Sequence, residues 1–210
     1  MPWQMRWAWL ITASMGLAHA GTLSVRVVDA QGKPVSDAVV TLAGASQPAA
    51  AHAASTRYID QKNETFIPYV QVVRPGDSVV FRNSDTTRHH VYSFSPVKSF
   101  EFILRPGESS SPVVLDRAGT VAVGCNIHDH MIAYLVISPE QAQMTAQQGL
   151  VKFDALAPGH YRVQVWHPQL HPGRPQPEAQ ADVSSNADVS LTLSLLPDPR
   201  SFVDREHVDY

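Results

Sequence analysis

The chain has 210 residues, of which 44% are hydrophobic and 17% charged, and its formal net charge at pH 7 is -3. These values are typical of a folded chain of one or two domains and exclude a disordered one, and the negative charge argues against nucleic acid as a partner. Sixteen prolines and eleven glycines predict many turns and few long helices, and the single cysteine, Cys125, excludes an internal disulfide.

Residues 1–20 have the layout of a secretory signal peptide. Arg6 is their only charge, residues 7–17 form a short apolar stretch, and Ala18-His19-Ala20 is an A-x-A cleavage site. The stretch is shorter than the about 20 apolar residues that a membrane span needs, and no later segment is long and apolar enough. We expect an exported, periplasmic protein without a membrane span; an uncleaved anchor is the alternative. In an oxidising compartment the lone cysteine is buried, paired between chains or held by a metal.

The remaining sequence predicts an all-β fold. Short alternating or apolar segments are separated by turn signals every 8–12 residues, which favours an antiparallel sandwich or barrel. We expect strands at residues 23–29, 35–42, 69–73, 78–82, 89–94, 100–104, 112–115, 120–123, 132–137, 150–153, 160–166 and 188–195. Residues 139–148 are expected to form a helical or irregular turn, and residues 197–210 a charged, poorly ordered tail.

The strands divide into a middle block and two flanking blocks. Two strands at the N-terminal side do not make a core alone, so we expect residues 21–48 and 141–197 to form one discontinuous β-sandwich of about five strands. Residues 55–139 would then be a second sandwich inserted into it after an alanine-rich linker, and residues 198–210 a tail. The alternative is that residues 21–48 extend the middle sandwich. The flanking segments VRVVDAQGKPVSDAVVTL and GLVKFDALAPGHYRVQVWHP resemble the carboxypeptidase regulatory-like, transthyretin-like family.

The middle block carries a set of metal-ligating residues. His89 lies just inside a predicted strand, and Cys125-x-x-His128-x-x-Met131 lies on one loop between two strands. A thiolate, two imidazoles and a weak thioether form the ligand set of blue-copper electron-transfer centres. The sequence therefore predicts one mononuclear type 1 copper site.

Residues 55–139 resemble the cupredoxins, most closely the amicyanin and plastocyanin group. The resemblance covers FIPYVQVVRPGDSVVFRNSDTTRHHV and RPGESSSPVVLDRAGTVAVGCNIHDHM, with the short C-x-x-H-x-x-M loop of amicyanin-like proteins. It implies a Greek-key β-sandwich in which His89 and His128 are the imidazole ligands, Cys125 the thiolate and Met131 the axial ligand. The core around the metal is expected to contain Phe81, Val91, Phe102, Val121 and Ile132, which would exclude water.

Some choices at the site remain open from the sequence. Period-two alternation places only one of His89 and His90 on the inner face, and the resemblance favours His89, with His90 facing solvent. Asp129 and His130 make the loop more polar than an amicyanin-like docking face. They form either a solvated loop or a second, weaker metal site. Zinc, bound by Cys125 and the two histidines, is the alternative to copper.

The resemblance implies a carrier of single electrons between two redox proteins, a donor and an acceptor, in an amine-oxidation or other respiratory chain. One alternative is a module that senses, stores or delivers copper. Another is an interaction protein whose outer sandwich binds a partner while the metal is incidental. We expect no enzymatic activity, no catalytic residues and no other cofactor, because four protein ligands leave the metal without an open position for a substrate.

Overall fold

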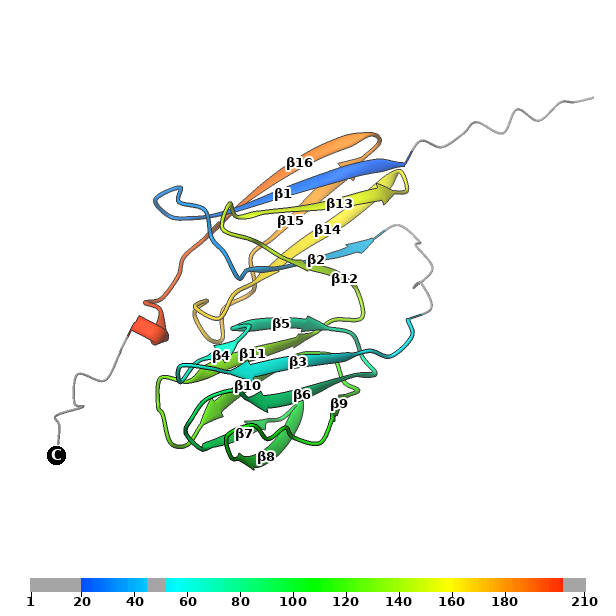
Figure 1. Cartoon of the computed structure of the whole chain (residues 1–210). Coiled ribbons are helices and arrows are strands. Elements are labelled where there is room, and N and C mark those ends of the chain that lie inside the picture. The colour runs from blue at the N-terminus through cyan, green and yellow to red at the C-terminus, as the bar shows by residue number, and fades with distance from the viewer. Residues whose placement is uncertain (1–19, 45–51, 202–210) are drawn as a thin grey trace, which may run out of the picture.

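Two units, each made of two facing β-sheets, are stacked on one another in the computed structural model (Figure 1). The structure describes residues 20–44 and 52–201, so residues 1–19 of the expected signal peptide, residues 45–51 of the linker and residues 202–210 of the tail lie outside it. The described residues form sixteen strands and one 3-10 helix, η1 (Pro199–Ser201). Within this part of the chain, no helix is long and apolar enough to cross a membrane.

The lower unit in Figure 1 consists of the central part of the chain. One sheet has the strand order β5-β11-β10-β7-β8 and the other the order β4-β3-β6-β9. Their facing side chains form a core that includes Ile59, Phe81, Val91 and Leu135. The strands are β3 (Thr56–Gln61), β4 (Phe66–Ile67), β5 (Val70–Val73), β6 (Asp77–Asn83), β7 (His89–Ser95), β8 (Lys98–Leu104), β9 (Val113–Leu115), β10 (Gly119–Cys125) and β11 (Ile132–Ile137).

The upper unit combines the two ends of the described chain. Its sheets have the orders β13-β1-β16 and β12-β2-β14-β15, and β1 pairs in parallel with β16 although more than 150 residues separate them (Asp29 pairs with Leu193). A separate core, which includes Leu23, Phe153 and Val163, lies between these sheets. The strands are β1 (Gly21–Asp29), β2 (Val39–Gly44), β12 (Gln141–Met144), β13 (Leu150–Leu156), β14 (Gly159–Trp166), β15 (Glu178–Val183) and β16 (Asn186–Leu193).

The structure corrects several local expectations. Residues 139–148 do not form a helical turn: β12 lies within them and pairs with β2. Strands β3 and β15 were not expected from the sequence, and the upper unit has seven strands rather than about five. Strand β12 has no alternating burial and is polar, so only its pairing with β2 makes it a strand.

The expected core around the site is right except at one position. Phe81, Val91 and Val121 are fully buried and Phe102 packs against them. Ile132 instead faces the junction between the two units. In β11 the inward side chains begin at Ala133, because successive residues of a strand face opposite sides of the sheet.

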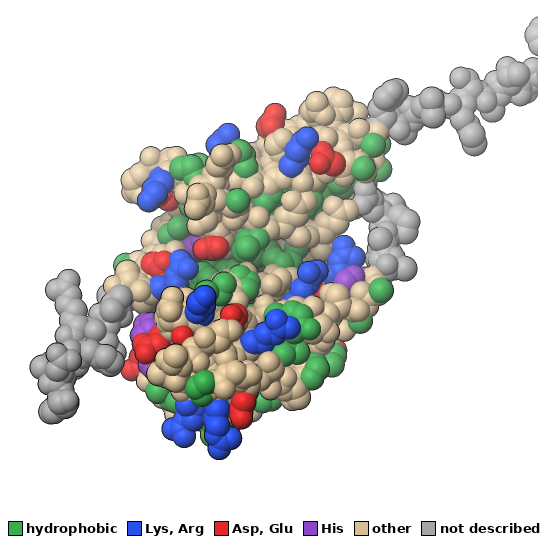
Figure 2. Space-filling model, in the orientation of Figure 1, with side chains coloured by type: hydrophobic (Ala, Val, Ile, Leu, Met, Phe, Trp, Pro, Cys, Tyr) green, Lys and Arg blue, Asp and Glu red, His purple; other side chains and the backbone are tan. Residues whose placement is uncertain are grey.

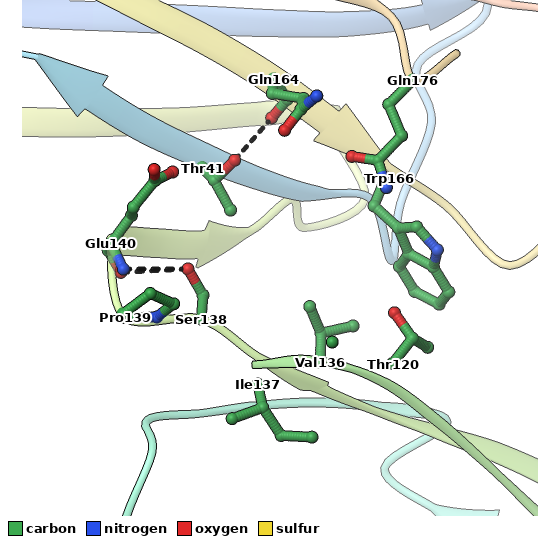
Figure 3. A pocket seen from close by; sticks show the side chains of 11 residues that line it. Thr41, Thr120, Val136, Ile137, Ser138, Pro139, Glu140, Gln164, Trp166 and Gln176 are labelled. Carbon is green, nitrogen blue, oxygen red and sulfur yellow. Dashed lines mark hydrogen bonds between the residues drawn. The ribbon is translucent and has the colours of Figure 1, made fainter. Parts of the chain in front are cut away.

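A third apolar cluster joins the two units. Val39 of β2 and Trp166 of β14 pack with Val70 of β5 and Val136 of β11, and Figure 2 shows hydrophobic side chains along this seam. Beside the cluster is a groove in which the Trp166 ring faces Val136 and Thr120 (Figure 3). None of the residues that line this groove is one of the predicted metal ligands. The upper unit thus covers the outward-facing side chains of β5 and β11.

The first residues of the expected tail are packed against this junction. The Arg200 guanidinium lies 3.6 Å from the centre of the Tyr69 ring and forms a 2.7 Å ion pair with Asp198. A cation over an aromatic face is attracted by the ring quadrupole. Residues 198–201 therefore belong to the folded part of the chain.

Asp77 stabilises the start of β6 in the lower unit. Its carboxylate is 1% exposed and accepts hydrogen bonds from the backbone N–H of Arg74 and from both the N–H and the hydroxyl of Ser55. His52 Nε2 lies 2.7 Å from the same carboxylate. Burial alone would raise the pKa of Asp77, but these donors outweigh it and hold the pKa well below its ordinary value.

Asp77→Asn is expected to lower the free energy of unfolding at pH 7 by about 2–3 kcal/mol, because the charged acceptor of several buried bonds is lost. The folded-state pKa lies below the unfolded one. Asp77 therefore stabilises the fold above the unfolded pKa, and its contribution is lost as the pH falls toward the folded pKa. Urea unfolding should show the full difference between the two proteins at pH 7 and at pH 5, and a smaller difference at pH 3. The exposed Asp116→Asn is the matched control, and equal effects of the two variants would contradict the prediction.

Candidate metal centre

Two neighbouring strands bring His89 and Cys125 to the same end of the lower unit. Strand β10 pairs with β7, with Cys125 opposite Val91. Val91 and His89 are two residues apart and both are fully buried, so they face the same side of the sheet. Cys125, 4% exposed, belongs to the core cluster on that side. The register of the two strands thus brings one imidazole to the thiol.

The loop between β10 and β11 brings the second imidazole back toward the thiol. The N–H of Cys125 donates to the carbonyl of Met131 at 3.2 Å, and the N–H of Met131 donates to the carbonyl of His128 at 3.0 Å. The N–H of Asn126 donates to the carbonyl of His90 at 3.0 Å, which ties the loop to β7. These backbone bonds make a tight loop in which His128 is half-buried.

The three side chains converge on one point. One ligand atom from each of His89, Cys125 and His128 lies within 4.8 Å of the other two. Cys125 Sγ is 3.7 Å from His89 Nδ1 and 3.8 Å from His128 Nδ1. The two imidazole rings have centroids 5.0 Å apart and are tilted by 59°. Burial lowers the pKa of the His128 imidazole, although the charge of Glu64 opposes this.

Carboxylates lie against the far nitrogen of both rings. His89 Nε2 donates to Asp85 Oδ2 at 2.8 Å, and His128 Nε2 is 3.4 Å from Glu64 Oε1. An ionised carboxylate only accepts hydrogen bonds, so Asp85 selects the tautomer of His89 in which Nε2 carries the proton. The Nδ1 of His89 then directs a lone pair toward the sulfur of Cys125. Glu64 lies at ion-pair distance from His128.

The Asp85 carboxylate accepts backbone hydrogen bonds in addition to the one from His89. The backbone N–H groups of Asn63 and Glu64 donate to its two carboxylate oxygens, at 2.5 and 2.9 Å. Burial raises the pKa of Asp85, but the bonds from Glu64, His89 and Asn63 outweigh it and lower the pKa overall. The carboxylate is therefore charged and fixed in position behind His89.

The donor separations fit a metal ion. Metal–thiolate bonds of about 2.3 Å and metal–imidazole bonds of about 2.0 Å, at an angle near 120°, place nitrogen and sulfur about 3.7 Å apart. The two observed Nδ1–Sγ separations agree with this value. One thiolate and two imidazoles form the equatorial set of a blue-copper site. Met131, 2% exposed, lies in the same buried cluster as Cys125 and would supply a thioether.

The neighbouring candidates do not join the cluster. His90 is on the outer side of β7, and its Nε2 pairs with Glu101 at 2.5 Å, as expected of the histidine that faces outward. Among the described residues, the one group able to hold a metal ion contains neither Asp129 nor His130. The His130 ring lies 6.2 Å from the His128 ring, measured between centroids.

Sequence reasoning missed two functional side chains, Asp85 and Glu64. Asp85 stands four residues before His89, inside the segment that resembles cupredoxins, but spacing alone did not show that it would contact the imidazole. Glu64 is distant in sequence from His128, and the two meet only because the hairpin of β3 and β4 lies beside the β10–β11 loop. Asn63 was the available signal of a turn, because asparagine is favoured at the first central position of a two-residue hairpin connection.

The fold and the site together form a β-sandwich with a buried His-Cys-His cluster at one end. Solved amicyanin structures match part of the chain. A reduced amicyanin variant is 20% identical, covers 47% of this chain and 98% of its own, and has a TM-score of 0.37. Amicyanin from Paracoccus versutus is 14% identical, with coverages of 47% and 97% and a TM-score of 0.37. A purple cupredoxin from Nitrosopumilus maritimus is 18% identical, with coverages of 39% and 98% and a TM-score of 0.34. No protein-family model and no curated protein sequence matches the chain.

Proposed function

We propose that this protein binds one copper ion in a type 1 site and carries single electrons between two redox proteins. The observation that supports it most directly is the convergence of two imidazole Nδ1 atoms on the buried sulfur of Cys125, at 3.7 and 3.8 Å. The single thiol proton of Cys125 can be donated to only one of the two nitrogen lone pairs, whereas a cation between the three atoms would bind all of them. His89, Cys125 and His128 would hold that cation, with Met131 as the weak fourth ligand.

Copper, when bound, would supply a one-electron couple between Cu(I) and Cu(II). The chain's own residues then limit how much the site rearranges. Asp85 and Glu64 hold the imidazoles from behind, and the loop bonds of Met131 hold the thiol. His128 is the least buried of the three ligands and is the proposed point of electron exit. Four protein donors leave no position for a substrate, which favours a carrier over an enzyme.

The compartment and partners are part of the proposal. The signal-like segment at residues 1–20 supports export to the periplasm, where a single cysteine needs protection from oxidation. Burial of Cys125 at 4% exposure and coordination to copper would both provide it. The partners are a donor and an acceptor protein that approach the loop containing His128.

Titration of the metal-free protein with Cu(II) tests the site. We expect one equivalent to produce an intense thiolate-to-copper absorption band and a narrow copper hyperfine splitting in the EPR spectrum. A colourless protein, or the spectrum of ordinary tetragonal copper, would sink the assignment. Electron self-exchange faster than loss of copper to a chelator supports a carrier, whereas the reverse order supports the copper-handling alternative.

A further inference from the structure

A tight turn in the lower unit lies directly behind the candidate metal centre. Strands β3 and β4 form a hairpin whose connection is closed by the N–H of Lys62 donating to the carbonyl of Thr65 at 3.0 Å. The two central residues, Asn63 and Glu64, have φ of 53° and 52°. These are values of a type I′ turn, which favours asparagine at the first central position and glycine at the second.

Glu64 is therefore an unfavourable choice for the turn itself. A non-glycine residue in the left-handed region costs energy, and such residues cluster where function requires them. Asparagine tolerates this region at the first position, but glutamate has no local advantage at the second. The contacts of the Glu64 side chain, rather than its turn propensity, explain why glutamate stands at this position.

The turn contacts both histidines of the centre. Its backbone N–H groups hold Asp85 against His89, and the Glu64 side chain itself reaches His128. The His128 side chain is 13% exposed and that of Glu64 is 39% exposed, so the contact lies at the edge of the site. Acidic and histidine side chains lie together at the left edge of the lower unit in Figure 2.

We propose that Glu64 is a positioning residue for the metal centre: its carboxylate accepts the Nε2 proton of His128 and aims Nδ1 at the thiol before metal binds. This inference rests on the proposed function and adds a residue to it. Asp85 does the same for His89, so one hairpin turn orients both imidazoles. An imidazole that donates to a carboxylate is also a stronger donor to the metal, which favours the more charged Cu(II) over Cu(I).

Glu64→Ala and Glu64→Gln test the role. Both keep the backbone N–H that Asp85 accepts, and both keep a non-glycine residue at the same φ. Glutamine retains an acceptor of the same reach without the charge. We expect Glu64→Ala to weaken Cu(II) binding about tenfold, as the loss of outer-shell partners does, and Glu64→Gln to retain most of the affinity. A tenfold fall in Cu(II) affinity relative to Cu(I) raises a one-electron reduction potential by about 59 mV.

Glu101→Ala is the matched control. Glu101 of β8 pairs with His90 of β7, which is not in the donor cluster, so removing Glu101 changes the net charge equally without touching a ligand. We expect its copper affinity to stay within about twofold of the parent, which limits the shift in potential to about 18 mV, since exposed pairs contribute little. Equal shifts in the Glu64 and Glu101 variants would overturn the positioning role in favour of a general charge effect.

A measurement on the metal-free protein separates this inference from the proposed function. Nitrogen-15 chemical shifts of the His128 ring show which nitrogen carries the proton. We expect the Nε2–H tautomer in the parent and a mixture of both tautomers in Glu64→Ala. An unchanged tautomer in Glu64→Ala would overturn the inference even if the protein binds copper. Absence of the thiolate-to-copper band in the parent would instead overturn the proposed function.

Discussion

Replacing Cys125 by serine is expected to abolish the thiolate-to-copper absorption band. Cu(II) binding should weaken by more than about a hundredfold, because loss of a ligand costs more than loss of an outer-shell partner, which costs up to about a hundredfold. The hydroxyl is a hard, largely protonated ligand, whereas the thiolate is soft and couples strongly to copper. Copper titration followed by visible absorption measures both effects. Far-UV circular dichroism of the metal-free variant should be unchanged, because serine nearly matches cysteine in volume.

His130→Ala is the control for this experiment. His130 lies on the same loop but outside the donor cluster, so its variant should keep the band and the affinity. A band that survives in Cys125→Ser, or one that is lost equally in His130→Ala, would refute the ligand assignment.

Asp85→Ala is expected to damage both stability and metal binding. The substitution removes the acceptor of three bonds, from the N–H groups of Asn63 and Glu64 and from His89 Nε2. Leaving such donors without a partner costs about 2–4 kcal/mol in the free energy of unfolding, and loss of the imidazole's partner lowers copper affinity about 10–100-fold. Urea unfolding of the metal-free protein and copper titration measure the two effects.

Asp60→Ala provides the comparison for Asp85→Ala. Asp60 lies in strand β3 and accepts from the Ser84 hydroxyl and from the backbone N–H of Gln61, without touching a histidine. Its loss should cost less than about 1 kcal/mol and leave copper binding intact. If the two variants were equally stable and loaded copper equally well, Asp85 would have no special role.

Much of the fold was predictable because the strands of the core alternate. The predicted segments 89–94 and 132–137 lie within a residue of β7 and β11, because β7 alternates in burial at its start and β11 is a short apolar segment. Strands β3, β12 and β15 escaped prediction. Their residues are largely polar or exposed, and pairing with a neighbouring strand provides their hydrogen bonds. The hydrophobic pattern of a segment does not predict such backbone pairing.

The candidate site was predictable to a similar extent. Cys125 and His128 are close in sequence, so their spacing alone indicated a shared ligand loop. His89 was preferred over His90 by strand alternation together with the family resemblance, and the structure places His89 in the cluster and His90 outside it. The outer contacts of Asp85 and Glu64 could not be inferred, because each depends on the hairpin turn at Asn63 and Glu64 meeting segments from other strands.

By itself, the sequence determined the all-β character and the candidate donors, because these follow from side-chain chemistry and from a local period of two along the strands. Only the tertiary structure decided which strands pair, including the parallel pair of β1 and β16, and which carboxylate stands behind each imidazole. The strand pair and the Glu64–His128 contact join residues far apart in the chain. Asp85 is only four residues from His89, but backbone N–H groups of the distant turn at Asn63 and Glu64 fix its carboxylate. These contacts are selected by the packing of whole sheets against one another, and no local pattern encodes that packing.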